Sequence, residues 1–214
     1  MIPCLNEAPT IGLLVEEVRQ YVEMVFVIDD GSSDRTAERA AGAGARVIPH
    51  VQNQGKGAAL QSGWKAAREG GFQWVLTLDG DGQHSPADIP AFFDCAARTS
   101  AALVVGNRMN APHKMPRLRR LVNRWMSRRL SGLAGQTLPD SQCGFRLLNL
   151  AVLGSLPITS QRFEVESEVL LAFARGGHRI EFVPIQSLYK SEQSKIHPVR
   201  DALRWLRWWR KATR

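Results

Sequence analysis

The sequence predicts an α/β fold: a mostly parallel, open sheet flanked by helices, followed by a C-terminal amphipathic helix. Short apolar runs alternate with longer amphipathic stretches over the first hundred residues, a spacing typical of parallel strands joined by crossover helices. Polar clusters follow these runs, where the strands are expected to end. The 214 residues, 44% hydrophobic and 22% charged, are enough for one domain with a sizeable core.

The predicted elements follow one another in a regular order. Apolar residues at 11, 14, 15 and 18 indicate a first helix over about 10–21. Buried strands are expected at 24–29, 45–50, 74–79 and 101–107, with helices at 34–44 and 55–71 between them. A further helix is expected with Ser85 as N-cap, Pro86 at its first position and Asp88 at its third. Only two or three residues precede the loop at 3–9, so the first strand looks truncated.

Charge is distributed unevenly along the chain, whose net charge is +8. Acids outnumber bases up to Asp94, whereas no acid occurs from Cys95 to Pro139. This division indicates a metal or nucleotide site in the first half of the chain and a binding region for an anionic partner in the second half. The scattered cysteines (Cys4, Cys95 and Cys143) argue against a disulfide framework or a zinc site and for a reducing compartment. We see no signal-peptide pattern and no apolar run of membrane-spanning length.

Four polar clusters stand at the ends of predicted strands: CLNE at 4–7, DDGSSD at 29–34, QNQGKG at 52–57 and DGDGQ at 79–83. Ligands of open parallel sheets bind outside the carboxyl ends of the strands. Each cluster alone could be a turn, a helix cap or a helix entry. Four of them at successive strand ends indicate a binding site.

These motifs resemble those of family 2 glycosyltransferases with the GT-A (Rossmann-like) fold. The polyprenyl-phosphate sugar synthases related to dolichol-phosphate mannose synthase are the most similar group. The matching segments include VIDDGSSDRT, NQGKGAALQSG, LTLDGDGQHSPADIP, VVGNR, DSQCGFRLL and SEQSK, in the order of the family. The resemblance implies a metal-dependent, inverting transfer of a sugar from a GDP- or UDP-sugar to a polyprenyl-phosphate lipid.

A divalent cation, Mg²⁺ or Mn²⁺, suits the diphosphate leaving group, because it neutralises the negative charge that builds up when the glycosidic bond breaks. The resemblance implies Asp79, Asp81 and Gln83 as its ligands, with Asp81 essential for catalysis. Their spacing lets three oxygens point the same way from an extended turn that Gly80 and Gly82 leave free to form. His84 is expected to be a polar neighbour.

The resemblance also places the donor nucleotide. Pro3, Leu5, Glu7 and Asp29 are expected to hold base and ribose, together with Asp79. Leu5 stands where relatives often carry an aromatic residue, so base stacking should be weaker here. Asp30 is expected to support its turn, and Lys56 to approach the phosphates.

The acceptor phosphate is expected to meet arginines, whose forked guanidinium groups match phosphate oxygens. By position these are Arg108, Arg119 and Arg124, with Ser194 and Lys195 closing over the site and Arg119 assisting catalysis. Asn123 stands in the same segment where relatives usually have Ser, and Lys190 where Arg is common. Both departures leave the identity of the acceptor open.

Asp140 is the acid nearest this basic segment. An ionised phosphate acceptor needs no general base, whereas a hydroxyl acceptor does. Asp140 could therefore be a base for a hydroxyl acceptor or could position the acceptor-binding arginines, and we favour the second role. Glu164, Glu166 and Glu168 are expected to be solvated or capping acids at a helix start, with Glu164 the candidate for touching the acceptor. A non-catalytic scaffold is a further alternative, but the intact DGDGQ argues against it. Nucleic-acid binding is not expected, since the chain lacks a recognition motif.

The tail at 197–214 is expected to be a basic, Trp-rich amphipathic helix attached to a catalytic domain at 1–196. Its basic side carries Arg200, Arg204, Arg207 and Lys211, and its apolar side Val199, Leu203, Leu206, Trp209 and Trp205. Such helices settle at membrane interfaces. The alternative is a helix docked on the protein's own core. We expect a cytoplasmic enzyme, peripheral on the inner face of the cytoplasmic membrane.

Overall fold

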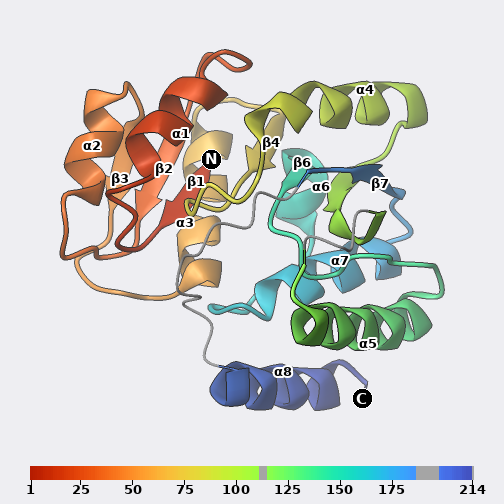
Figure 1. The fold of residues 1–214 in the computed structure, drawn as a ribbon. Coiled ribbons are helices and arrows are strands. Elements are labelled where there is room, and N and C mark those ends of the chain that lie inside the picture. Colours follow the sequence, from red (N-terminus) through yellow and green to blue (C-terminus); the bar gives the residue numbers. More distant parts are fainter. Residues whose placement is uncertain (111–114, 187–197, 214) are drawn as a thin grey trace.

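The computed structural model describes residues 1–110, 115–186 and 198–213, with the backbone alone at 110 and 198–202. In these residues two small sheets lie edge to edge, and helices cover them (Figure 1). The backbone N–H of Leu78, just after the first strand of the second sheet, donates to the carbonyl of Met1 at 3.1 Å and so joins the two sheets. The α/β architecture predicted from the sequence is confirmed.

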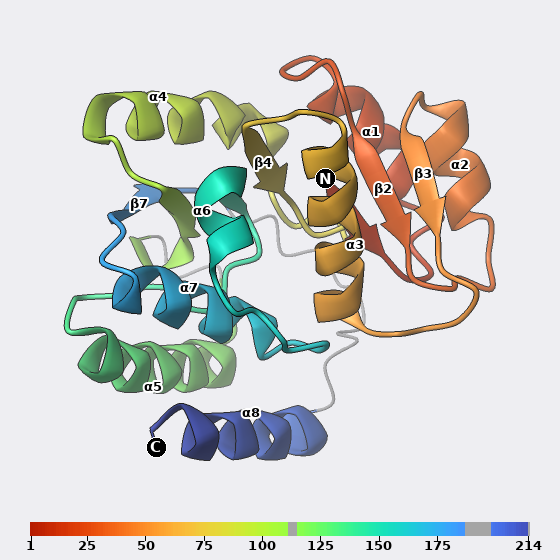
Figure 2. The ribbon, with the colours of Figure 1, turned by 180° about the vertical axis from the view of Figure 1, so that it is seen from behind.

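The first sheet is parallel, with β1 (Ile2–Cys4), β2 (Phe26–Asp29) and β3 (Arg46–Pro49) in the order β1-β2-β3. The helices α1 (Ile11–Val18) and α2 (Thr36–Gly42) lie on one face of this sheet, and α3 (Lys56–Glu69) lies on the other (Figure 2). The strand-helix alternation of this half is the one that the hydrophobic pattern predicts. As expected, β1 is short.

The second sheet has the order β4-β6-β5-β7, and it is mixed rather than parallel. Its strands are β4 (Trp74–Thr77), β5 (Leu103–Asn107), β6 (Arg146–Asn149) and β7 (Ile180–Pro184). β5 and β7 are parallel, whereas β6 runs antiparallel to both of its neighbours. The sequence pattern did not predict β6, which enters the sheet from a long loop instead of a crossover helix.

The second half adds helices around this sheet. They are α4 (Ile89–Thr99), α5 (Arg117–Ala134), α6 (Leu150–Ser155), α7 (Val165–Arg175) and α8 (Pro198–Ala212). Short 3-10 turns lie at Pro86–Asp88 and Arg108–Asn110. The predicted N-cap at Ser85, with Pro86 directly after it, is confirmed; the Ser85 carbonyl accepts from the N–H of Asp88 at 3.1 Å, and its side chain makes no capping hydrogen bond.

α8 packs on the rest of the protein through its tryptophans. Trp205 is buried, its indole N–H donates to the Ser167 hydroxyl at 3.0 Å, and its ring lies 5.4 Å from that of Trp125 on α5. Arg175 of α7 donates to the carbonyl of Ala212 at 2.6 Å. The expectation that Trp205 faces a membrane is therefore wrong, because this side chain docks on α5 and α7. In the described residues, no helix combines the length and the apolar character needed to cross a membrane.

Candidate active site

The loop after β1 and the DGDGQ turn after β4 touch each other at the carboxyl edge of the strands. The hydroxyl of Thr10 donates to the carbonyl of Gly80 at 2.7 Å. A Cβ at position 80 would lie 2.7 Å from Cys4 Sγ, so only glycine allows this approach. The two loops that the sequence assigns to nucleotide and metal thus form one surface.

The first loop is also fixed to the DDGSSD segment. Asn6 adopts a positive φ of 53°; its N–H donates to the Ser32 hydroxyl at 2.8 Å, and its side-chain oxygen accepts from the N–H of Ser33 at 2.8 Å. The N–H of Glu7 donates to the Thr36 hydroxyl at 2.8 Å. Pro3, Leu5 and Glu7 remain partly exposed at the rim of this surface.

Asp29 and Asp30 are both buried at the end of β2, where they shape the neighbouring loops. Asp29 accepts from the N–H of Ser32 at 3.0 Å. Asp30 accepts from the N–H groups of Gln54 and Gly55 at 2.9 and 2.7 Å, and its carboxylate also meets the ring of His50 at 2.7 Å. Asp30 therefore holds the loop that leads into α3, which agrees with a turn-supporting role.

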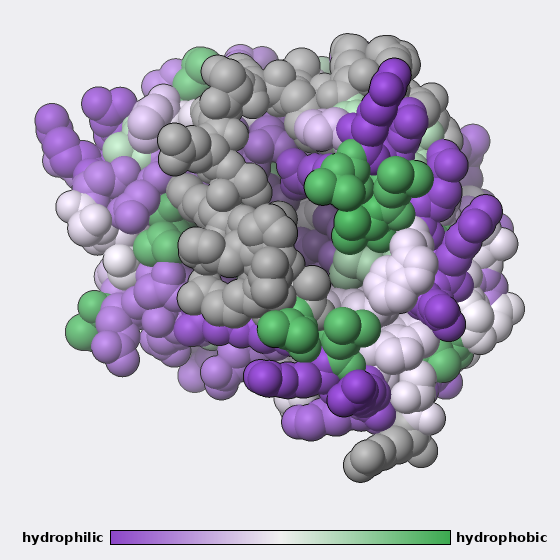
Figure 3. Space-filling model, turned by 60° about the horizontal axis from the view of Figure 1, so that its bottom comes forward, coloured by the Kyte–Doolittle hydropathy of each residue, from purple (hydrophilic) through white to green (hydrophobic). Residues whose placement is uncertain are grey.

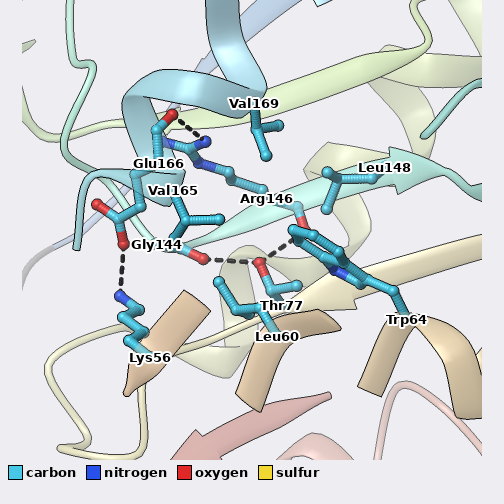
Figure 4. A pocket seen from close by; sticks show the side chains of 10 residues that line it. All are labelled: Lys56, Leu60, Trp64, Thr77, Gly144, Arg146, Leu148, Val165, Glu166 and Val169. Carbon is cyan, nitrogen blue, oxygen red and sulfur yellow. Dashed lines mark hydrogen bonds and ion pairs between the residues drawn. The ribbon is translucent and has the colours of Figure 1, made fainter. Parts of the chain in front are cut away.

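Lys56, the first residue of α3, pairs with Glu166 (Figure 4) and also with Asp79. Its ammonium is 2.6 Å from Asp79 Oδ1 and also pairs with Glu166, a buried residue of α7. A Cβ at Gly144 would lie 2.6 Å from the Asp79 oxygens, so the loop before β6 closes tightly over this carboxylate. The ion-paired set of Lys56, Asp79 and Glu166 ties α3, the end of β4 and α7 together.

These charges act in opposite directions on the two aspartates of the turn. Burial by itself would raise the pKa of Asp79, but the Lys56 ammonium outweighs it and holds that pKa well below its usual range. Burial and the nearby Asp79 charge raise the pKa of Asp81 to about 6. Burial would lower the pKa of Lys56, yet the carboxylates of Asp79 and Glu166 raise it. Among the residues that the structure describes, Asp81 is therefore the carboxylate of this turn that lacks an ion-paired cation.

The DGDGQ turn at 79–83 is the part of the site that could hold a metal ion. The described parts of the chain contain no cluster of three His, Cys, Asp or Glu side chains that could hold an ion. Asp81 lies partly exposed in a tight turn, its carboxylate accepting from the N–H of Gln83 at 3.0 Å, and Gly82 has a φ of 65°. Two carboxylates and one amide from a single turn fit Mg²⁺ or Mn²⁺, which keep ligand positions for substrate phosphate and water.

His84 follows the turn but is buried against the core, with its ring 5.4 Å from that of Phe145. Burial lowers its pKa to about 4. It is thus a neutral, packed side chain beside the turn.

Asp140 is the centre of a buried hydrogen-bond network. Arg108 donates to it from Nε at 2.8 Å and from Nη2 at 2.9 Å, and Asn123 donates at 2.9 Å. The backbone N–H groups of Arg108 and Gln142 donate as well, at 3.1 and 3.2 Å. Burial alone would raise the pKa of Asp140, but Arg108 and these hydrogen bonds hold it at about 2. Arg108 and Asn123 are buried too, and both are engaged with Asp140.

The remaining acceptor candidates lie apart from this network. Arg119 is half-buried and Arg124 is exposed, both on α5. Ser194 and Lys195, like Lys190, fall outside the described residues.

Glu166 is the site residue that the sequence interpretation missed, because it was expected to be solvated or capping. Residues two apart in a helix point about 200° away from each other, so three acids at 164, 166 and 168 cannot share one side. The spacing of two residues between these acids was therefore the sequence signal that one of them could be buried. Glu168 is not a helix cap: it accepts from the N–H groups of Thr159 and Ser160 at 3.1 and 2.7 Å and so holds the loop before α7.

Arg146 on β6 was missed as well. Its guanidinium donates to the carbonyls of Cys143 and Glu166 at 2.7 Å each, and to that of Ser141 at 3.1 Å (Figure 4). It joins the loop over Asp79 to the start of α7. No pattern in the sequence separates this buried arginine from the exposed ones.

The chain is similar to curated transferases that use lipid phosphates. It is 30% identical over 212 residues to the UDP-N-acetylglucosamine–dolichyl-phosphate N-acetylglucosaminyltransferase of Methanococcus voltae, covering 88% of this chain and 84% of that protein. It is 29% identical over 198 residues to the undecaprenyl-phosphate mannosyltransferase of Micrococcus luteus, covering 86% and 81%.

Solved structures share the fold. Glucosyl-3-phosphoglycerate synthase from Mycobacterium tuberculosis in complex with UDP is 26% identical, with a TM-score of 0.71 over 94% of this chain and 73% of that one. The same enzyme in complex with Mg²⁺ and UDP superposes with a TM-score of 0.74 at 24% identity, over 99% and 76%. The model of the family described as glycosyl transferase family 2 matches residues 1–156. The chain belongs to this family of glycosyltransferases.

Proposed function

We propose that this enzyme transfers a sugar, with inversion, from a UDP- or GDP-sugar to a polyprenyl-phosphate-type lipid, and that it depends on a divalent metal ion. The observation that carries the proposal is the contact between the first loop and the DGDGQ turn, with Asp81 partly exposed beside the ion-paired Asp79. The lipid-phosphate acceptors of the curated relatives support the same class of acceptor here.

For the donor, Pro3, Leu5, Glu7 and Asp29 would hold base and ribose, since these residues line or shape the surface formed by the first two loops. Asp30 acts indirectly, by fixing the loop that delivers Lys56. Lys56 would contact the diphosphate of the donor, because its ammonium pairs with Asp79, the first residue of the DGDGQ turn.

For the metal, Asp79, Asp81 and Gln83 would be the ligands. The raised pKa of Asp81 supports this, because a carboxylate without a matching positive charge favours binding of a cation. The bound ion would act as a Lewis acid on the diphosphate leaving group. The chain's own part is to place the carboxylates and to keep Lys56 beside them.

For the acceptor, the state of Asp140 favours a phosphate over a hydroxyl group. A general base needs a free lone pair facing the substrate, whereas Asp140 is fully buried and accepts five hydrogen bonds from protein groups. It is a positioning residue for Arg108 in this proposal. Arg119 and Arg124 would contact the acceptor phosphate, assisted by Ser194 and Lys195.

We also propose that the protein attaches to the inner face of the cytoplasmic membrane without spanning it. A lipid acceptor with a long polyprenyl chain stays in the bilayer, so the catalytic site has to be held at that surface. The exposed basic residues of α5 and α8 would supply the electrostatic part of this attachment.

The proposal is tested by release of nucleotide from UDP- and GDP-sugars with four acceptors: none, a polyprenyl phosphate, the matching polyprenol, and 3-phosphoglycerate. We expect turnover with the lipid phosphate, its loss in EDTA, and its recovery with Mg²⁺ or Mn²⁺. Equal turnover with the polyprenol or with 3-phosphoglycerate would show that the acceptor is a hydroxyl group.

A further inference from the structure

Over residues 117–127, α5 presents its apolar side to solvent and the polar residues Asn123 and Ser127 to the protein interior, whereas Leu130 further along packs in the core. Leu118, Leu121, Val122 and Trp125 are 74%, 60%, 47% and 45% exposed, and their spacing of i, i+3, i+4 and i+7 puts them on one face. Ser127 is buried and lies nine residues after Leu118, about two and a half turns away, on the opposite side. This is the reverse of the pattern in a helix that packs on a soluble core.

The inner polarity of α5 has a structural cause. Asn123 donates to Asp140 at 2.9 Å, and the Ser127 hydroxyl accepts from the N–H of Ser141 at 2.9 Å. These side chains satisfy the buried network around Asp140. The apolar outer side has no such explanation, because none of its residues contributes to that network.

α8 extends the same surface. It lies beside α5 in both ribbon views, and Trp205 packs against Trp125 (Figures 1 and 2). Its tryptophans face the protein, whereas Leu203 and Leu206 are 50% and 41% exposed. The face of the molecule that carries these helices shows green hydrophobic groups among purple hydrophilic ones (Figure 3). We name the set of Leu118, Leu121, Val122, Trp125, Leu203 and Leu206 the α5/α8 apolar face.

Positive charge borders this face. The exposed basic side chains on the two helices are Arg117, Arg124, Arg128, Arg129, Arg207, Arg210 and Lys211. Neither α5 nor residues 203–213 contain a single acid. The Arg129 guanidinium lies 5.7 Å from the centre of the Trp125 ring, so the rim and the apolar residues are in direct contact.

We propose that the α5/α8 apolar face inserts into the headgroup region of an anionic bilayer, with α5 as the main contact. Leucine, valine and tryptophan surrounded by arginine match an interface where apolar chains meet negative headgroups. A second copy of the chain is a poor occupant, because it would bring the same arginines against each other. The inference rests on the proposed use of a lipid-borne acceptor. It differs from attachment by the tail alone, since four of the six apolar residues belong to α5.

The orientation of α5 relates the α5/α8 apolar face to the proposed acceptor site. α5 carries Asn123 inward to the Asp140 network and Leu118 and Leu121 outward, so its first turns lie between that network and the bilayer. A phosphate that projects from the headgroup layer would then meet the start of α5, where Arg119 lies.

The test uses the full chain and the double variant Leu118→Ser/Leu121→Ser, sedimented with vesicles of phosphatidylcholine containing phosphatidylglycerol. Both leucines are exposed, so the variant should fold normally. The matched control is Leu13→Ser/Phe93→Ser, which removes two exposed apolar side chains from α1 and α4. We expect the α5 variant to lower the partition coefficient at least about tenfold, because two apolar side chains no longer leave water, and the control to leave it unchanged.

Three outcomes separate this inference from its rivals. Equal binding of the α5 variant and wild type would overturn it. A dimer of the wild type in analytical ultracentrifugation that the α5 variant abolishes, without vesicle binding, would show that a second copy covers the face. Vesicle binding is measured without substrate, so normal binding by a protein that rejects every lipid phosphate would refute the proposed function and leave the membrane face standing.

Discussion

The ammonium of Lys56 lies 2.6 Å from the carboxylate of Asp79, the first residue of the DGDGQ turn. Glu166 completes the set from α7. One cation thus balances the carboxylates of Asp79 and of the buried Glu166, while Asp81 next to them has no ion pair among the described residues. This distribution of charge leads to separate predictions for Lys56 and for Asp81.

Lys56→Met should destabilise the protein by about 3–5 kcal/mol at neutral pH, because it leaves two carboxylates together without a countercharge. The loss should shrink as pH falls and these acids become protonated. Urea unfolding at several pH values measures it. Lys65→Met on the exposed side of the same helix is the control, since its contact with Glu69 spans 3.8 Å at the surface and should be worth little. Similar unfolding curves for the two variants would contradict this account.

Asp81→Asn should stabilise the metal-free protein at neutral pH by roughly 1–3 kcal/mol while abolishing transfer. The pKa of Asp81 is about 6 in the folded state, above its ordinary value of 3.8. Between these values the folded protein holds a proton that the unfolded chain releases, so the contribution of Asp81 to stability falls as pH rises through this window. The asparagine cannot ionise and still accepts from the N–H of Gln83.

The Asp81→Asn gain should therefore be present above about pH 6 and vanish below about pH 4. Unfolding in urea with EDTA across this range measures it. A gain that does not change with pH would mean that burial of the Asp81 charge is not its source. Retention of normal turnover would remove Asp81 from the catalytic site.

Asp140→Asn should lower transfer without removing the acidic limb of the profile of kcat/KM against pH, the limb that titration of a general base would produce. The carboxylate holds Arg108 and Asn123, so its neutralisation leaves a buried guanidinium unpaired, at a cost of about 3–5 kcal/mol. Arg108→Gln should have a similar effect on stability, because it breaks the same pair. Measurement of kcat/KM against pH for both variants distinguishes the roles. A selective loss in Asp140→Asn that tracks one titrating group, with Arg108→Gln active, would identify Asp140 as a base.

Arg119→Ala should weaken use of a short-chain, water-soluble prenyl phosphate by about tenfold to a hundredfold or more, the effect of losing one charge-assisted contact of roughly 1.5–3 kcal/mol. Nucleotide affinity, measured by calorimetry, should stay the same. Arg128→Ala, an exposed residue of the same helix, is the control and should leave both quantities unchanged. Lost nucleotide affinity with normal acceptor kinetics would move Arg119 to the donor side.

The sequence predicted the first half of the fold well, because the alternation of apolar runs and amphipathic helices is a local pattern. It did not predict β6, since Arg146–Asn149 is a short segment whose antiparallel pairing depends on strands far away in the chain. The expectation that Asp30 supports its turn was based on its position directly after a predicted strand. The burial of Glu166 and Arg146 was not predicted, because it depends on partners in other elements: Lys56 lies 110 residues before Glu166, and Arg146 donates to carbonyls of the loop before β6 and of α7. The outward apolar side of α5 was not predicted either, because its apolar residues are interspersed with arginines in the sequence.

Trp205→Ala should release α8 from the protein while leaving much of the membrane binding intact. The indole packs against Trp125 and donates to Ser167, so its loss removes both the apolar contact and the hydrogen bond, a combined cost of about 3–5 kcal/mol for a buried tryptophan. Since this cost falls on the docking of one helix, hydrogen exchange should show faster exchange in α8 while β5 and α5 stay protected. Leu206→Ala on the same helix is the control and should change stability by no more than about 0.5 kcal/mol, because that side chain is exposed. With α5 in place, Trp205→Ala should bind anionic vesicles more strongly than Leu118→Ser/Leu121→Ser does. The reverse order would show that α8, and not α5, carries the attachment.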